Sequence, residues 1–191
     1  MLTDDKKIST PEYWDNFYAG KNNTPVDNSN TVRTITFDRF DWVVNQIVPG
    51  FDLAILDVGS GHARIPERIT ARWPHMYVMA SDQSEEAKKI SKYRPYITCT
   101  AYTVPFKDKF FDVVICTQAM EYMEDNDLFL KEAKRVAKKV IITVPSNEMK
   151  KWSQLRIYTE ASLKELVQRY GTIEHFEKHE DLFLVKVKFF E

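Results

Sequence analysis

Short apolar runs alternate with amphipathic stretches along most of this chain. The apolar runs predict strands at 53–58, 77–81, 96–100, 111–117 and 140–144. Apolar side chains that recur three and four positions apart predict helices over 34–48, 62–73, 85–92, 126–138 and 159–170. Strands that alternate with helices in this way favour a mostly parallel sheet with helices on both of its faces.

The two ends of the chain depart from this alternation. Residues 172–178 and the alternating stretch Val185–Phe189 predict an antiparallel hairpin that turns near residues 179–181. Residues 1–33 are polar and predict an N-terminal arm or lid beside a single domain over 34–191. Within this arm, four aromatic residues at helical spacing predict a short helix that packs on the domain: Tyr13, Trp14, Phe17 and Tyr18.

The composition is that of one globular domain. The chain has 191 residues, 43% of them hydrophobic, which is enough for a core. A formal net charge of −1 argues against a dedicated nucleic-acid binder. Neither a membrane span nor the apolar core of a signal peptide is indicated by the sequence. We interpret Cys99 and Cys116, which lie in strand-like runs, as reduced core residues of a cytoplasmic protein.

A glycine loop follows the first predicted strand. The strand ends at Asp57, and Gly59 and Gly61 come before the next helix, so the backbone there can approach a ligand closely. The dinucleotide-binding pattern requires a third glycine five positions after the first, and this chain has the bulky Arg64 at that place. A pyrophosphate is therefore not the ligand that this loop favours.

The loop and the segments after it resemble the class I S-adenosylmethionine-dependent methyltransferases. Asp57, Gly59 and Gly61 match the first motif of that family, with Ala63 in place of its last glycine. Asp82 follows at the end of the second strand, where the family has an acidic residue that accepts hydrogen bonds from a ribose. Further matches come in the family's order: Val104-Pro105-Phe106, Phe111-Asp112-Val113-Val114, Gln118–Tyr122 and Phe129–Val136.

This resemblance implies a fold and a cofactor. The fold would be a three-layer, doubly wound α/β structure with a mostly parallel, seven-stranded sheet and a C-terminal antiparallel hairpin, and the cofactor would be S-adenosylmethionine. The residues that the resemblance places at the cofactor are Asp57, Gly59, Gly61, Asp82, Gln83, Thr100, Ala101, Tyr102 and Thr117. Thr100 stands where many relatives have an aspartate for the adenine amino group.

The acceptor and any general base are less clearly indicated. Many relatives have a Glu-His pair after the fourth strand, whereas this chain has Glu121-Tyr122. Glu121, Tyr122 and His62 are the candidates for a base. Without a large insert for a macromolecule, a small-molecule acceptor is favoured. The alternatives are an inactive binding or regulatory protein of the same fold and, less favoured, an RNA or protein methyltransferase.

Two further groups of residues could be given a chemical role. His175 and His179 are four positions apart in a stretch that predicts a strand and turn, so they do not have the spacing of helical metal ligands, and we predict no metal site. We interpret five basic residues in and after the helix of 126–138 as a solvated face: Lys131, Lys134, Arg135, Lys138 and Lys139.

Overall fold

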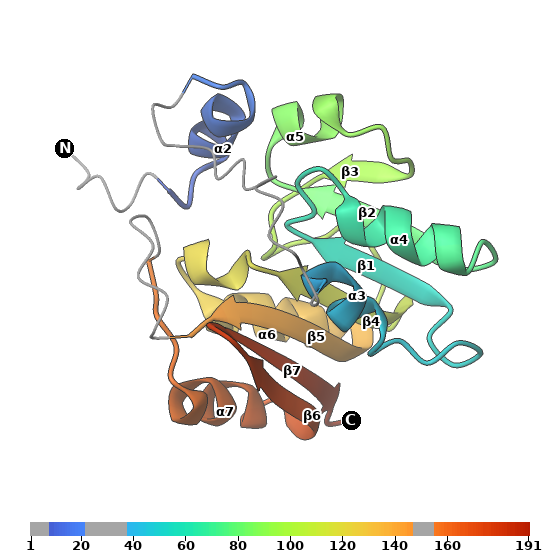
Figure 1. Cartoon of the computed structure of the whole chain (residues 1–191), viewed down its shortest axis with the longest axis vertical. Helices are drawn as coiled ribbons and strands as arrows, with labels where there is room; N and C mark the ends of the chain where they lie inside the picture. Colours follow the sequence, from blue (N-terminus) through green and yellow to red (C-terminus); the bar gives the residue numbers. More distant parts are fainter. Residues whose placement is uncertain (1–7, 22–37, 147–154) are drawn as a thin grey trace.

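The computed structural model describes residues 8–21, 38–146 and 155–191 (Figure 1). Within them, one sheet has seven strands in the order β3-β2-β1-β4-β5-β7-β6. The strands are β1 (Ala54–Val58), β2 (Tyr77–Asp82), β3 (Tyr96–Thr98), β4 (Phe111–Thr117), β5 (Ala137–Pro145), β6 (Gly171–His179) and β7 (Leu182–Phe189).

The first five strands are parallel to their neighbours in the sheet. The β6–β7 hairpin is antiparallel, and β7 pairs with β5 in the antiparallel sense. The chain winds outward from β1 to β3 on one side and then returns to place β4 on the other side of β1. In such sheets, ligands bind beyond the carboxyl ends of the strands at this point of reversal.

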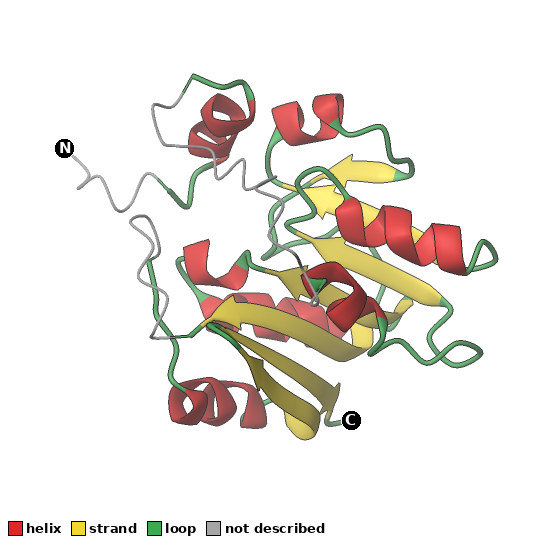
Figure 2. Cartoon of the chain, in the orientation of Figure 1, coloured by secondary structure: helices red, strands yellow, loops and turns green. Residues whose placement is uncertain are grey.

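Helices cover both faces of the sheet, as Figure 2 shows. The buried side chains of α3 (Arg39–Val44) and α4 (Arg64–Arg72) pack with Ile55, Val113 and Ile141 from one face. Those of α6 (Asn126–Val136) and α7 (Glu160–Gln168) pack with alternate strand residues on the other face. This alternation along buried parallel strands confirms the predicted three-layer, doubly wound architecture.

Several predicted boundaries were wrong. The helix of 126–138 ends at Val136 because Ala137 is extended and pairs with Phe111, which starts β5 three residues before the predicted 140. The helix predicted from 62 starts at Arg64, since Ala63 takes a left-handed conformation. The third strand ends at Thr98, before Cys99. The predicted start of the helix at 34–37 lies outside the described residues.

The predicted aromatic helix near the N-terminus is α2 (Pro11–Tyr18), which lies beside α5 (Glu85–Ile90) in Figure 1. Thr10 caps α2, and none of the helix residues is fully buried. Among the described residues, no helix is long and apolar enough to cross a membrane, and no group of acidic, histidine or cysteine side chains could hold a metal ion.

Candidate functional site

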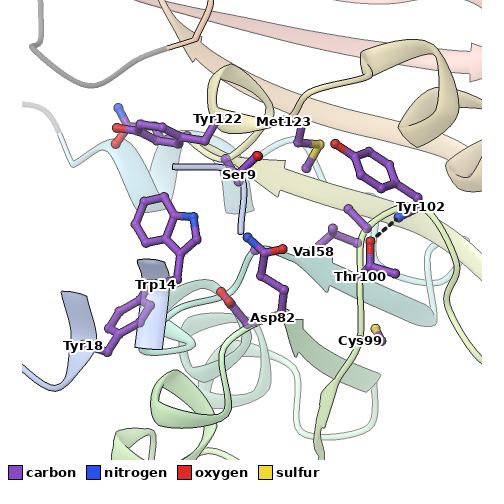
Figure 3. Close-up of a pocket in the computed structure, with 15 residues that line it drawn as sticks. Ser9, Trp14, Tyr18, Val58, Asp82, Cys99, Thr100, Tyr102, Tyr122 and Met123 are labelled. Carbon is purple, nitrogen blue, oxygen red and sulfur yellow. Dashed lines mark hydrogen bonds between the residues drawn. The ribbon is translucent and has the colours of Figure 1, made fainter. Parts of the chain in front are cut away.

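A cavity of about 650 Å³, its open mouth included, lies beyond the carboxyl ends of β1, β2 and β4 (Figure 3). Val58 and Gly59 line it after β1, and Asp82 and Gln83 line it at the end of β2. The position agrees with the glycine loop and with the point where the strand order reverses.

Both glycines of the loop are required by close packing. Gly59 and Gly61 have φ angles of 73° and 51°, in the left-handed region that side chains disfavour. A Cβ on Gly59 would lie 2.5 Å from the Cβ of Ala119, and one on Gly61 would lie 2.5 Å from the hydroxyl oxygen of Tyr18. The loop therefore fits closely between the segment after β4 and helix α2.

Asp57 supports this loop from beneath. Its carboxyl group is buried and does not line the cavity, and it accepts a hydrogen bond of 2.5 Å from the hydroxyl of Ser60. Burial raises the pKa of the Asp57 carboxyl to about 7, although the Ser60 hydrogen bond opposes the shift and the charge of Asp82 adds to it.

Asp82 reaches the cavity and also holds the loop in place. One carboxylate oxygen accepts a hydrogen bond of 2.9 Å from the Gly61 amide, and the other accepts one of 3.0 Å from the Ser84 amide. Burial raises the pKa of Asp82, and these backbone hydrogen bonds counteract it. Carboxylate lone pairs that remain on the cavity side are suited to the hydroxyl groups of a sugar.

The loop after β3 forms another wall of the cavity. Thr100, Ala101 and Tyr102 line it, and the Thr100 hydroxyl accepts a hydrogen bond of 3.2 Å from the Tyr102 amide (Figure 3). Cys99 lines it as well. This cysteine is half-buried and packs against the core, whereas Cys116 is fully buried within it. Both cysteines are free thiols.

Comparison with known proteins agrees with this geometry. Residues 56–141 match the family described as "Methyltransferase domain". A solved SAM dependent methyltransferase from Aquifex aeolicus is similar in structure, with a TM-score of 0.71 and 18% identity, over 98% of this chain and 100% of that chain. The PH0226 protein from Pyrococcus horikoshii OT3 gives a TM-score of 0.67 at 18% identity, over 78% of this chain and 87% of that one.

In sequence, an uncharacterised methyltransferase-like protein of Schizosaccharomyces pombe is 27% identical over 101 residues. These residues are 51% of this chain but only 39% of that protein. The chain thus resembles methyltransferase domains in sequence over residues 56–141, and its fold is similar to that of a solved SAM dependent methyltransferase.

The predicted site residues of this chain fall into two groups. Six of them line the cavity: Gly59, Asp82, Gln83, Thr100, Ala101 and Tyr102. The other three do not line it: Asp57, Gly61 and Thr117. Gly61 lies directly beneath the Tyr18 hydroxyl, and Thr117 is the last residue of β4, paired in register with Thr143.

The three candidates for a general base are placed very differently. Tyr122 lines the cavity and its ring packs edge-on against that of Trp14, with 5.1 Å between the centroids. Glu121 is buried outside the lining. His62 is exposed beside the ring of Tyr18, and partial burial lowers its pKa, with the charge of Arg64 acting in the same direction.

The site residues predicted from the sequence do not include all of the residues that line the cavity. Ser9, Gln118 and Met123 line the cavity, and Gln118 does so from a left-handed conformation with a φ angle of 50°. Gln118 accepts a hydrogen bond of 3.1 Å from the Arg39 guanidinium. Gln118 and Met123 lie just after β4, where the chain leaves the sheet, and this position is the signal that could have identified them.

Proposed function

We propose that this protein binds S-adenosylmethionine in the cavity and transfers its methyl group to a small-molecule acceptor. The observation that carries the proposal is the buried Asp82 carboxylate between the glycine loop and the segment Thr100–Tyr102. In this arrangement Asp82 would hold the ribose hydroxyls, and Thr100, Ala101 and Tyr102 would surround the adenine. Gly59 and the neighbouring backbone would accommodate the methionine part.

The bound cofactor would supply a sulfonium group that makes the methyl carbon electrophilic. The task of the protein is then to align the acceptor with that carbon and to exclude water. Trp14, Tyr18 and Tyr122 form an aromatic wall suited to this task. Tyr122 is the one candidate base that reaches the cavity. As a neutral phenol its hydroxyl would orient the acceptor by a hydrogen bond, and it would take the acceptor's proton only as the phenolate.

The charges of the cavity narrow the class of acceptor. Among the described residues that line it, Asp82 is the one with a charged side chain, and the aromatic rings add the negative faces of their π-systems. The described lining residues include no cationic side chain that could pair with a carboxylate or phosphate of the acceptor. We therefore propose an acceptor whose reacting part is uncharged or an amine, with an apolar body that packs on Trp14 and Tyr122.

Calorimetry with S-adenosylhomocysteine, the demethylated cofactor, tests the cofactor site. Asp82→Asn should weaken binding by about 1–3 kcal/mol, because the amide replaces a carboxylate oxygen that accepts hydrogen bonds. Glu165→Gln, which removes an exposed acid on α7, is the matched control and should bind as the unmodified protein does. Folded protein that gives no heat with either cofactor form would contradict the proposal.

A binding or regulatory protein without turnover is the second candidate. It is favoured by the position of Glu121 outside the lining and of His62 beyond Tyr18. Incubation with methyl-labelled S-adenosylmethionine and a panel of amines, phenols and carboxylic acids separates the two functions. Labelled product from an amine or a phenol supports the enzyme, whereas tight cofactor binding without any product supports the second candidate.

A further inference from the structure

Helix α2 contributes to the cavity without being anchored in the core. Trp14 and Tyr18 line the cavity from this helix, yet no residue of α2 is fully buried. The hydrophobic contacts that hold most helices in place are therefore limited here. Other interactions must fix the position of α2 relative to the sheet.

Asp15 provides such an interaction with helix α5. One of its carboxylate oxygens accepts a hydrogen bond of 2.6 Å from the Ser84 hydroxyl and one of 3.1 Å from the Glu86 amide. These groups lie at the N-terminus of α5, where backbone amides lack partners within the helix. Hydrogen bonds to a charged group are stronger than those between neutral groups, so this contact is well suited to hold α2.

Ser84, which makes this contact, is also hydrogen-bonded to the proposed cofactor residue Asp82. The Ser84 amide donates to the Asp82 carboxylate, while the Ser84 hydroxyl donates to Asp15. Ser84 itself is completely buried and caps α5 by accepting from the Ala87 amide. One fixed residue thus connects the floor of the cavity, at Asp82, with the helix that covers it.

The same placement of α2 brings its aromatic residues over the cavity. The Tyr18 hydroxyl lies above Gly61. Trp14 packs against Tyr122 on the segment after β4, and Figure 3 shows these two side chains next to each other. A ligand extended along the glycine loop would therefore lie beneath α2. If α2 shifted, both Trp14 and Tyr18 would move away from the position that the cavity requires.

We propose that Asp15 is a positioning residue that seats α2 over the bound cofactor through Ser84. In this role Asp15 slows the release of the cofactor and fixes the aromatic wall of the acceptor site, although it touches neither ligand. This role rests on the proposed function, because it assumes that the cofactor occupies the cavity. The proposal gives a function to the N-terminal helix α2. The methyltransferase core starts near β1 and does not require this helix for its fold.

Stopped-flow dissociation of S-adenosylhomocysteine from the full chain measures this retention. Asp15→Ala should raise the dissociation rate about 5- to 20-fold, as expected for the loss of two charge-assisted hydrogen bonds at a partly exposed site. Asp15→Asn keeps an acceptor oxygen and should restore part of the retention. Glu12→Ala removes an exposed acid of the same helix and should leave the rate unchanged.

Hydrogen exchange of the amides of residues 11–18 tests the seating of α2 independently. Faster exchange in Asp15→Ala than in Glu12→Ala, with unchanged exchange in β1 and β4, supports the role and shows that the core remains folded. Cofactor binding with equal dissociation rates and equal exchange in both variants would overturn the role of Asp15 alone. If the unmodified protein fails to bind the cofactor, the proposed function is overturned and the retention with it.

Discussion

At the scale of single residues, the glycine loop shows which departures from a motif matter. Gly59 cannot be replaced without a clash, because a Cβ there would lie 2.5 Å from that of Ala119. Ala63 also has a positive φ angle, of 60°, which costs an L-residue roughly 1–2 kcal/mol. Its methyl group is completely buried, however, and burial of one such group stabilises by about 0.8 kcal/mol. Burial therefore offsets only part of the conformational cost, and alanine in place of glycine leaves a net cost of roughly 0.2–1.2 kcal/mol.

Asp57 should make the stability of the protein depend on pH. Its folded-state pKa of about 7 lies above the unfolded value of about 3.9, so the folded protein binds the extra proton between these values. Stability should therefore be greatest below pH 4, as far as this group is concerned, and should fall as the pH rises to 7. The Asp57→Asn variant is neutral at every pH, so its free energy of unfolding should not show this decline. The decline amounts to about 2–4 kcal/mol in the unmodified protein.

Urea unfolding at pH 5 and pH 8 measures the difference. From pH 5 to pH 8, the unmodified protein should lose more of its free energy of unfolding than Asp57→Asn does. Asp82 is present in both proteins, so the part of its raised pKa that does not depend on Asp57 cancels in the comparison. A difference that is independent of pH would show that Asp57 is already ionised in the folded state.

At the scale of elements, helix α6 holds the segment that leads into β4. Arg135 is not the solvated residue that the basic pattern indicated. Its guanidinium donates to the carbonyl oxygens of Val104 and Phe106, at 3.1 and 2.8 Å, and pairs with Asp108 and Glu132. A planar group with several donors is required for these contacts.

Arg135→Ala should consequently destabilise the protein by about 2 kcal/mol, because two carbonyl groups and two carboxylates lose their partner. Lys131→Ala changes an exposed residue of the same helix and should alter stability by less than about 0.5 kcal/mol. Thermal or urea unfolding of the two variants gives the comparison. Equal stability of both would mean that the solvated interpretation of Arg135 was correct.

Sequence patterns located best those elements in which the spacing of the apolar residues agrees with the faces that are buried in the structure. The run Phe111–Thr117 is buried on both faces as β4. Val185, Val187 and Phe189 lie on one face of β7, as their alternation predicts, although Lys186 on the other face is also buried. The junction of α6 and β5 was missed, because Ala137 and the lysines after it suit a helix equally well. Pairing of Ala137 with Phe111 decides between the two conformations, and that partner is distant in sequence.

At the scale of the whole molecule, the order of motifs predicted the topology, and six of the nine expected cofactor residues line the cavity. The placement of α2 could not be predicted, because the partner of Asp15 is 69 residues away and its aromatic spacing does not say which surface it contacts. A ligand in the cavity would join segments as distant as Ser9, Asp82 and Met123. Cofactor binding should accordingly stabilise the molecule as a unit, and the size of this effect can be calculated from mass action.

S-adenosylhomocysteine at 100 times its dissociation constant should add about 2.7 kcal/mol to the free energy of unfolding. For a chain of this length, that corresponds to a rise in melting temperature of roughly 5–11 °C. Adenosine at the same concentration reaches Asp82 and Thr100–Tyr102 but not the glycine loop, so its shift should be clearly smaller. Equal shifts from the two ligands would mean that the loop after β1 contributes no binding energy, and that the methionine part does not lie beneath α2.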